Sequence, residues 1–260
     1  MDDLRLTMIQ SDIVWENREA NLNKQENRLK ELSGKTDLIV FPEMFTTGFS
    51  MNSASLADTE NGETIQRLKH WSDTYEFALS GSFICVQDNQ YFNRGFFIAP
   101  GNNPVYYDKR HLFRMGNESQ NFSAGNRQTI TTYKGWNICL SICYDLRFPV
   151  WLRNNEARYD LLLVSACWPQ PRISTWDILL QARAIENQAY VCGVNRVGKD
   201  PSGLYYPGHS AVIDPKGKTL LSASEGTESI DTATLSANDL IRFRKKFPVL
   251  QDADLFTIHI

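Results

Sequence analysis

Apolar residues occur in short runs that alternate with amphipathic stretches, and this pattern sets the expected order of elements. The apolar run at residues 4–10 predicts a strand. Over residues 17–34 the apolar positions recur with a period of about 3.6 residues, which predicts a helix that stops at Gly34. The same order then returns, with a buried strand over 37–43 and an amphipathic helix over 62–76.

The rest of the chain continues this alternation of strands and helices. Strands without a clear apolar and polar alternation imply sheets covered on both faces, and the intervening helices supply the cover. The expected class is therefore α/β in layers, with residues 1–260 as one domain, since no low-complexity linker or solenoid repeat divides the sequence. The remaining predicted elements are strands over 77–87, 90–100 and 104–109, two strands within 129–145 around a turn at Lys134-Gly135, a helix over 148–157, a strand over 159–166, a helix over 175–188, a strand over 189–198 and a hairpin over 208–223.

Composition and charge narrow the classes of partner. Of the 260 residues, 42% are hydrophobic and 12% aromatic, which is typical of a globular protein and excludes wholesale disorder. The 27 basic and 30 acidic side chains are interspersed and give a net charge of -3, so nothing favours nucleic acid as a partner. A short basic cluster near the C-terminus is expected to be a solvated face rather than a polyanion site, and it consists of Arg242, Arg244, Lys245 and Lys246.

Targeting signals and cofactor motifs are not evident in the sequence. The N-terminus starts acidic and lacks the regions of a secretory signal. No stretch approaches the roughly 20 apolar residues of a membrane helix, so we expect a soluble, cytoplasmic protein with no membrane partner. The four histidines form no zinc-type spacing with the cysteines, so no metal site is expected. The odd cysteine count argues against a disulfide framework and favours small buried hydrophobes at Cys85, Cys139, Cys143, Cys167 and Cys192.

Three of the apolar strands end on a polar residue that is able to react, namely Glu43, Lys109 and Cys143. Binding sites gather beyond the carboxyl ends of strands, so the three residues converge if their strands lie side by side. A thiol is only partly ionised at neutral pH and needs a base or a cation beside it. Glu43 is suited to take the thiol proton, while Lys109 and the backbone N–H of Tyr144 are suited to stabilise an oxyanion.

Each of these residues also has a plain structural interpretation. A cysteine at a strand end, such as Cys143, is most often part of the core. Glu43 follows Phe-Pro and fits a loop or capping residue, and Lys109 lies between Asp108 and Arg110 in what fits a solvated turn. Taken from the residues alone, the trio suggests a site and names no reaction.

The segments around these residues resemble the nitrilase (carbon–nitrogen hydrolase) superfamily. FPEMFTTGF is similar to its general-base segment, YDKRHLF to its lysine segment and SICYDLRFP to its nucleophile segment. The resemblance continues in order through YDLLLVSACWP, QARAIENQAYVCGVNRVG and GHSAVIDPKGK, so it covers essentially the whole chain. It implies a four-layer α-β-β-α sandwich that pairs into a homodimer or a higher homo-oligomer and uses no cofactor.

The resemblance also implies roles for individual residues. Glu43 is then the base, Lys109 the oxyanion stabiliser and Cys143 the nucleophile. The superfamily has a second glutamate after the lysine, and Glu118 in GNESQNFSAG occupies that place. Its implied role is to orient Lys109 or to assist proton transfer, and the alternative is a surface loop acid.

Within the superfamily, FPEMFTTGFSMN and YDKRHLFRMGNE resemble the ω-amidase branch. That branch implies hydrolysis of the terminal amide of short 2-oxo dicarboxylic acid monoamides, such as 2-oxoglutaramate and 2-oxosuccinamate. Such a substrate carries a carboxylate, which Arg147 in CYDLRFP is suited to bind, unless Arg147 pairs with Asp145 instead. The aromatic residues expected to wall the pocket are Phe45, Phe49, Tyr144 and, with the strongest support, Trp168.

Several rival functions fit the same residues. A deaminated-glutathione amidase, an N-carbamoyl amino acid hydrolase and a true nitrilase would all use this Glu-Lys-Cys chemistry on another substrate. A catalytically idle scaffold or binding protein is a more remote alternative, because such a protein has no need of all three residues. His111 and His209 are expected to be structurally bonded rather than catalytic.

Overall fold

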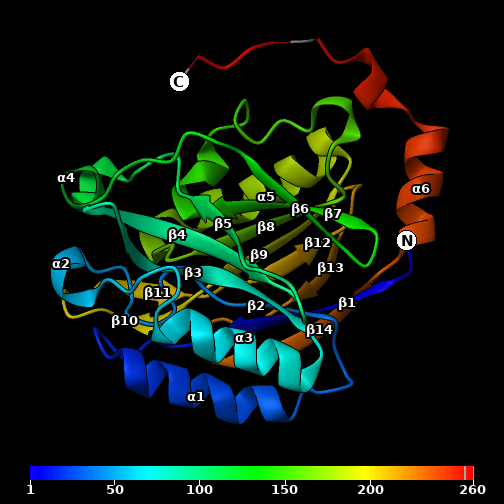
Figure 1. The fold of residues 1–260 in the computed structure, drawn as a ribbon. Helices are drawn as coiled ribbons and strands as arrows, with labels where there is room; N and C mark the ends of the chain where they lie inside the picture. The colour runs from blue at the N-terminus through cyan, green and yellow to red at the C-terminus, as the bar shows by residue number, and fades with distance from the viewer. Residues whose placement is uncertain (255, 260) are drawn as a thin grey trace.

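Two six-stranded sheets packed face to face form the centre of the molecule (Figure 1). The structure, a computed structural model, describes residues 1–254 and 256–259. The strand order in the first sheet is β14 (Ser229–Leu235), β1 (Leu4–Gln10), β2 (Leu38–Val40), β3 (Ala78–Gln87), β4 (Gln90–Ile98) and β5 (Val105–Asp108). The order in the second sheet is β13 (Thr219–Ser222), β12 (Ala211–Ile213), β9 (Tyr190–Asn195), β8 (Leu161–Ala166), β7 (Trp136–Ile142) and β6 (Thr129–Tyr133).

Both sheets have a parallel centre and antiparallel flanks. Strands β1, β2 and β3 run parallel in the first sheet, and β7, β8 and β9 run parallel in the second. Parallel strands are buried on both faces, which explains runs such as LLLVSA in β8, where every residue is buried. The carboxyl ends of the central strands in each sheet therefore lie at a common edge.

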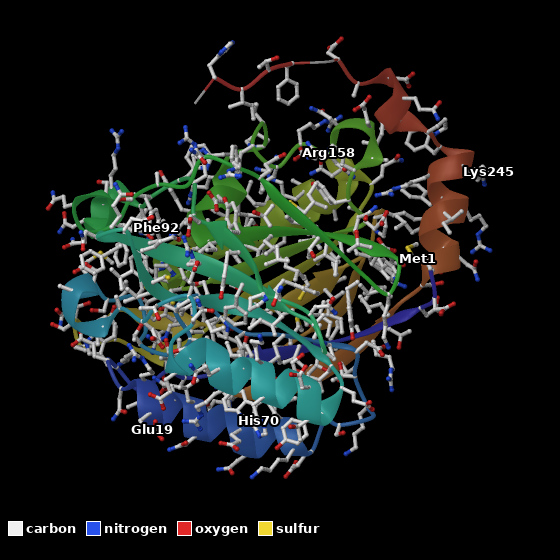
Figure 2. All side chains as sticks on the ribbon, in the orientation of Figure 1. Met1, Glu19, His70, Phe92, Arg158 and Lys245 are labelled. Atoms are coloured by element: carbon white, nitrogen blue, oxygen red, sulfur yellow. The ribbon has the colours of Figure 1, made fainter. Side chains whose placement is uncertain are left out.

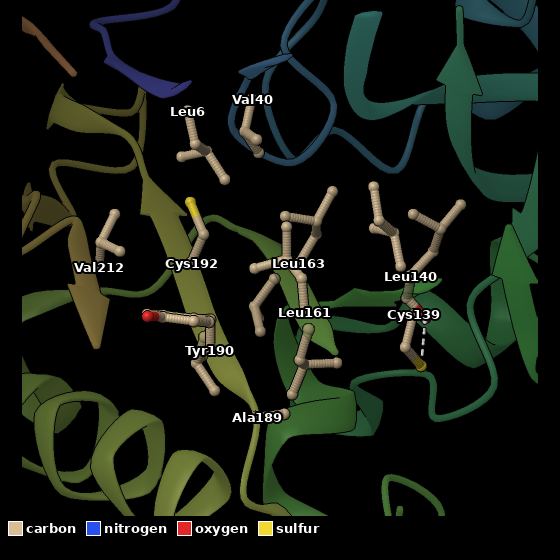
Figure 3. Close-up of a cluster of buried hydrophobic side chains, with 14 of the residues drawn as sticks. Leu6, Val40, Cys139, Leu140, Leu161, Leu163, Ala189, Tyr190, Cys192 and Val212 are labelled. Atoms are coloured by element: carbon tan, nitrogen blue, oxygen red, sulfur yellow. Dashed lines mark hydrogen bonds between the residues drawn. The ribbon is translucent and has the colours of Figure 1, made fainter. Parts of the chain in front are cut away.

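The main hydrophobic core lies between the two sheets. Leu6 and Val40 of the first sheet point toward Leu163, Cys192 and Val212 of the second (Figure 3). All five side chains are buried. Burial of such a side chain stabilises the fold by about 1.5–3 kcal/mol, so this layer holds the two sheets together.

Helices cover the outer faces of both sheets. Helices α1 (Arg18–Lys30) and α3 (Glu63–Tyr75) lie together on the first sheet, and their polar residues, such as Glu19 and His70, face outward (Figures 1 and 2). A second core cluster joins these helices to the sheet. Helix α5 (Ile173–Asn187) packs on the second sheet and completes the four layers α-β-β-α, so the predicted architecture is confirmed.

Two predicted elements differ from the structure. The helix expected over 148–157 is wrong, because the chain forms turns there and a single 3-10 turn, η3 (Asn155–Ala157). The side chain of Asn154 bonds both backbone groups of Tyr159, which competes with helical hydrogen bonds. The strand expected over 189–198 ends with β9, and β10 (Val197–Lys199) then pairs with β11 (Tyr205–Pro207) in a separate two-stranded sheet.

The basic cluster near the C-terminus belongs to a helix that the sequence pattern did not predict, α6 (Ala237–Lys246). Arg242 and Lys245 are exposed, and Lys245 points away from the molecule in Figure 2. Arg244 does not belong to a solvated face, contrary to the expectation. Its guanidinium is half-buried, lies 2.6 Å from a carboxylate oxygen of Asp160, and thereby ties α6 to the loop before β8.

The described part of the chain contains no helix that is both long and apolar enough to span a bilayer. It also contains no cluster of three His, Cys, Asp or Glu side chains arranged for a metal ion. All five cysteines are free thiols, and every one except Cys143 is buried.

Candidate active site

Glu43, Lys109 and Cys143 meet at the edge where the central strands end, but their strands do not lie side by side. Glu43 follows β2 and Lys109 follows β5, with β3 and β4 between these strands. Cys143 follows β7 in the opposite sheet. The three residues converge because the sheets pack face to face, and the Ser165 hydroxyl donates to the Phe41 carbonyl across the two sheets at 2.8 Å.

Lys109 is held between two carboxylates. Its ammonium nitrogen lies 2.8 Å from Glu43 Oε1, and 3.0 and 2.9 Å from the two oxygens of Glu118. Glu118 opens the short helix α4 (Glu118–Asn121), and its second oxygen also accepts the Phe113 N–H at 2.6 Å. The side chains of Lys109, Glu43 and Glu118 are fully buried. Glu118 is therefore not the surface loop acid of the alternative interpretation.

Asn93 joins this group, and sequence reasoning missed it. Its amide nitrogen donates to Glu43 Oε1 at 2.7 Å and to Glu118 Oε1 at 3.0 Å, while its oxygen accepts the Ser82 hydroxyl at 3.0 Å. Asn93 lies in the middle of β4 and is buried. Asn is depleted in strands, so an Asn inside the apolar run YFNRGFF was the available signal.

Cys143 lies at a sharp turn that directs its thiol away from β7. Its φ of 45° is in the left-handed region, which is unfavourable for a residue with a Cβ, and it begins the 3-10 helix η2 (Cys143–Arg147). The sulfur lies 3.9 Å from the Cys167 carbonyl oxygen. Such strain persists only where neighbouring contacts hold the turn, and most of those contacts come from Asp145.

The fully buried carboxylate of Asp145 accepts the Ile142 N–H at 3.1 Å, the Tyr107 hydroxyl at 2.7 Å, and both the N–H and the imidazole Nδ1 of His111 at 2.9 and 2.8 Å. These bonds lock the turn after Cys143 to the lysine loop. They also leave Asp145 without any bond to Arg147 in the described residues, which removes the alternative interpretation of Arg147.

Glu43 and Cys143 flank the same residue, Cys167, which follows the carboxyl end of β8. Glu43 Oε2 accepts the Cys167 N–H at 2.9 Å, and the Cys143 thiol lies against the Cys167 carbonyl. The Cys167 thiol in turn donates to the Glu43 carbonyl at 3.3 Å. The bond from the Cys167 N–H orients the carboxylate of Glu43 independently of Lys109.

The electrostatics of the site favour a neutral thiol at rest. Burial raises the pKa of Cys143, and the charge of Glu43 raises it further, so that it lies well above the usual value despite the opposing effect of Lys109. Burial would lower the pKa of Lys109, but the carboxylates of Glu118 and Glu43 outweigh it and raise that pKa well above its usual value. Burial also raises the pKa of Glu118. A thiol with a raised pKa needs a base to ionise it during the reaction.

A cavity of about 830 Å³ opens onto this group, and both Cys143 and Lys109 line it. Among the residues predicted to bind substrate, four line the same cavity: Arg147, Tyr144, Phe49 and Trp168. The Lys109 ammonium lies 5.2 Å from the Phe49 ring centre, and the Arg147 guanidinium lies 5.0 Å from that of Trp168.

Phe45 does not line the cavity, contrary to the expectation. Its ring stacks on Phe41 with centres 4.7 Å apart and is 1% exposed. It belongs to the core between the first sheet and its helices. The Phe45 side chain fills this core, and Phe49, four residues later, lines the cavity instead.

The two histidines have structural partners, as predicted. His111 stacks on Phe148 with ring centres 3.6 Å apart, in addition to its bond with Asp145. His209 lies 3.1 Å from the carboxylate of Asp177. Neither lines the cavity that holds Cys143.

Known proteins identify the family of this chain. The model of the carbon-nitrogen hydrolase family matches residues 5–245. The chain belongs to this family. It is therefore a hydrolase of non-peptide carbon–nitrogen bonds, and the predicted membership of the nitrilase superfamily is confirmed.

Relatives of this carbon–nitrogen hydrolase match it over its whole length. The omega-amidase YafV of Yersinia enterocolitica is 42% identical over 258 residues, which cover 99% of this chain and 100% of the relative. The 2-oxoglutaramate amidase of Bacillus subtilis is 32% identical over 251 residues, which cover 95% and 96% of the two chains. A superfamily protein of Xanthomonas campestris, solved with an arsenic adduct in its active site, superimposes with a TM-score of 0.97 at 38% identity and full coverage of both chains.

Proposed function

We propose that this enzyme hydrolyses the terminal amide of short 2-oxo dicarboxylic acid monoamides, such as 2-oxoglutaramate and 2-oxosuccinamate, to the 2-oxo acid and ammonia. The observation that carries the proposal is the identity of 42% with an omega-amidase across essentially the whole chain. The site supports it, because a thiol and an ammonium held by two buried carboxylates border one cavity, whose wall also contains arginine side chains that form no ion pair in the described part of the chain. A small anionic amide matches this set of groups.

In the first half of the proposed reaction, Glu43 takes the proton of Cys143 and the sulfur attacks the amide carbon. The developing oxyanion accepts hydrogen bonds from Lys109 and from the backbone N–H of Tyr144. Collapse of the tetrahedral intermediate breaks the carbon–nitrogen bond, and Glu43 returns the proton to the departing ammonia. A thioester on Cys143 remains.

In the second half, Glu43 takes a proton from water and the hydroxide attacks the thioester. The same donors stabilise the second oxyanion, the carbon–sulfur bond breaks, and the thiolate regains a proton. Glu43 is positioned for both steps, because Lys109, Asn93 and the Cys167 N–H hold its two oxygens. Glu118 keeps the charge of Lys109 in place through both steps.

A panel of amides tests the proposed substrate. Ammonia release is measured with 2-oxoglutaramate, 2-oxosuccinamate, deaminated glutathione, carbamoyl amino acids and simple nitriles, and the protein mass is recorded for an acyl adduct on Cys143. We expect the two 2-oxo acid amides to give the highest kcat/KM. A higher value for another class would transfer the assignment to that class, and no turnover of any amide would favour the idle scaffold.

Replacing Glu118 by Gln is expected to lower kcat by about 10- to 100-fold, the range for loss of a charge-assisted hydrogen bond, while the fold is retained. Gln keeps one acceptor for the ammonium of Lys109 but lacks the negative charge that stabilises this ammonium. Steady-state kinetics and circular dichroism check the result. Glu31→Gln, on an exposed site, is the matched control. An unchanged kcat would reduce Glu118 to a structural residue.

A further inference from the structure

Two arginines, Arg147 and Arg172, line the cavity beside the catalytic group. Both are half-buried, and within residues 1–254 and 256–259 neither guanidinium forms an ion pair or donates a hydrogen bond. Each instead lies over an aromatic ring, Arg147 over Trp168 at 5.0 Å and Arg172 over Phe113 at 5.2 Å. A guanidinium stacked on a ring in this way keeps its N–H donors available for a ligand.

Five cavity-lining residues form a series of contacts that begins and ends on η2, and we call them the arginine ring. Arg147 and Tyr144 stand on η2, and the Tyr144 ring lies 5.2 Å from that of Phe113 in an edge contact. The Arg172 guanidinium lies over the Phe113 ring, and the Arg172 carbonyl accepts the Trp168 indole N–H at 2.8 Å. The Arg147 guanidinium lies over the Trp168 ring. This series brings both cations to the wall next to Cys143.

The other charged groups of the cavity are already engaged. The ammonium of Lys109 is held by two carboxylates. The carboxylate of Glu16 accepts the hydroxyl of Ser50. Asp200 accepts hydrogen bonds within its own turn, including two from Ser202, and although burial opposes them these bonds lower the pKa of Asp200. The arginine ring is therefore the part of the wall that is free to bind an anion.

We propose that Arg172 is a second substrate-binding cation and forms, with Arg147, a clamp that selects the 2-oxo acid end of the substrate. This inference rests on the function proposed above. A 2-oxo acid presents three adjacent acceptor oxygens, two from the carboxylate and one from the ketone. Two guanidinium groups present only donors, five N–H groups each, so one side chain pairs with the carboxylate while the other reaches the ketone oxygen.

The clamp also excludes the 2-amino analogue. L-glutamine carries an ammonium where 2-oxoglutaramate carries the ketone oxygen. In the arginine ring this ammonium faces two guanidinium groups of like charge. The two guanidinium groups thus discriminate between amides that differ at a carbon remote from the reacting bond.

Arg172→Gln tests the clamp, with Arg172→Lys as the conservative variant and Arg242→Gln, at an exposed position of α6, as the control. For 2-oxoglutaramate we expect Arg172→Gln to lower kcat/KM by about 10- to 100-fold, with most of the change in KM. Arg172→Lys should recover part of the loss, because it keeps the charge without the planar fork. The preference for 2-oxoglutaramate over L-glutamine should fall in parallel, and Arg242→Gln should match the wild type.

A second measurement needs no turnover. Iodoacetamide alkylates the thiol of Cys143, and 2-oxoglutarate protects it by filling the cavity. In Arg172→Gln we expect the alkylation rate without ligand to stay unchanged and the half-protecting concentration of 2-oxoglutarate to rise about 10- to 100-fold. An unchanged half-protecting concentration overturns the clamp, and so does an altered alkylation rate without ligand, because it would indicate that Arg172 positions the thiol. If the wild type hydrolyses no 2-oxo acid amide, the proposed function fails, while the protection experiment still decides the clamp.

Discussion

Replacing Cys143 by Ala is expected to abolish turnover, with kcat lower by at least about 10⁴-fold and the fold retained. The variant removes the sulfur that attacks the amide carbon, and neither Glu43 nor Lys109 supplies another nucleophile of this kind. The fold should tolerate the change, because the turn after β7 is held by Asp145 rather than by the thiol. The backbone φ at this position is 45°, and Ala, which is smaller than Cys, adds no strain to it.

Ammonia release and intact-protein mass check this expectation together. The wild type should accumulate an acyl adduct during turnover, and Cys143→Ala should not. Cys167→Ala is the matched control, because Cys167 lines the same cavity and yet has no role as a nucleophile in the proposed reaction. Full activity in Cys143→Ala would falsify the mechanism, and an adduct on Cys167 would move the nucleophile to the neighbouring strand.

Replacing Lys109 by Met is expected to remove activity and also to destabilise the protein. Two carboxylates, Glu43 and Glu118, would then lie in the interior without the cation that pairs with both. Breaking a buried ion pair by removing one partner typically lowers the free energy of unfolding by about 3–5 kcal/mol. Met has a similar length, so packing alone does not account for a loss of this size.

The dependence on pH separates this electrostatic effect from a packing effect. Burial raises the pKa of Glu118 and the charge of Lys109 opposes that shift, so removal of Lys109 raises the folded-state pKa of Glu118 further above its unfolded value. A group shifted upward in this way favours the folded state below its unfolded pKa and loses that contribution as the pH rises through the folded pKa. The deficit of Lys109→Met relative to the wild type should therefore be smaller near about pH 5 than near about pH 8.

Denaturant unfolding at the two pH values measures this difference, with Lys35→Met at an exposed site as the control. A deficit that is equal at both pH values would mean that the loss comes from packing. In that case the carboxylates would not depend on Lys109 for their charge.

The periodicity of apolar residues and the composition of the apolar runs predicted most helices and strands of the fold. Apolar runs such as 159–166 predicted buried strands, and the spacing over 17–34 and 175–188 predicted the helices that cover the sheets. Competition between side-chain and helical hydrogen bonds was harder to predict. Asn154 bonds Tyr159 and prevents the helix expected over 148–157, and such a bond depends on where the loop returns.

The sequence alone determined which residues are proposed for the chemistry, because Glu43, Lys109, Glu118 and Cys143 stand in segments similar to one family. Only the tertiary structure decided how they meet. Lys109 acquires two buried carboxylates because the segments after β2 and β5 of the first sheet converge at one edge, and the contact with Glu43 joins residues 66 positions apart. Packing of the second sheet on the first then brings Cys143 to this group. Asn93 joins the site because β4 lies between β2 and β5 in the first sheet, and Phe45 enters the core that the helices form on that sheet, since the direction of a side chain depends on the layer that covers it.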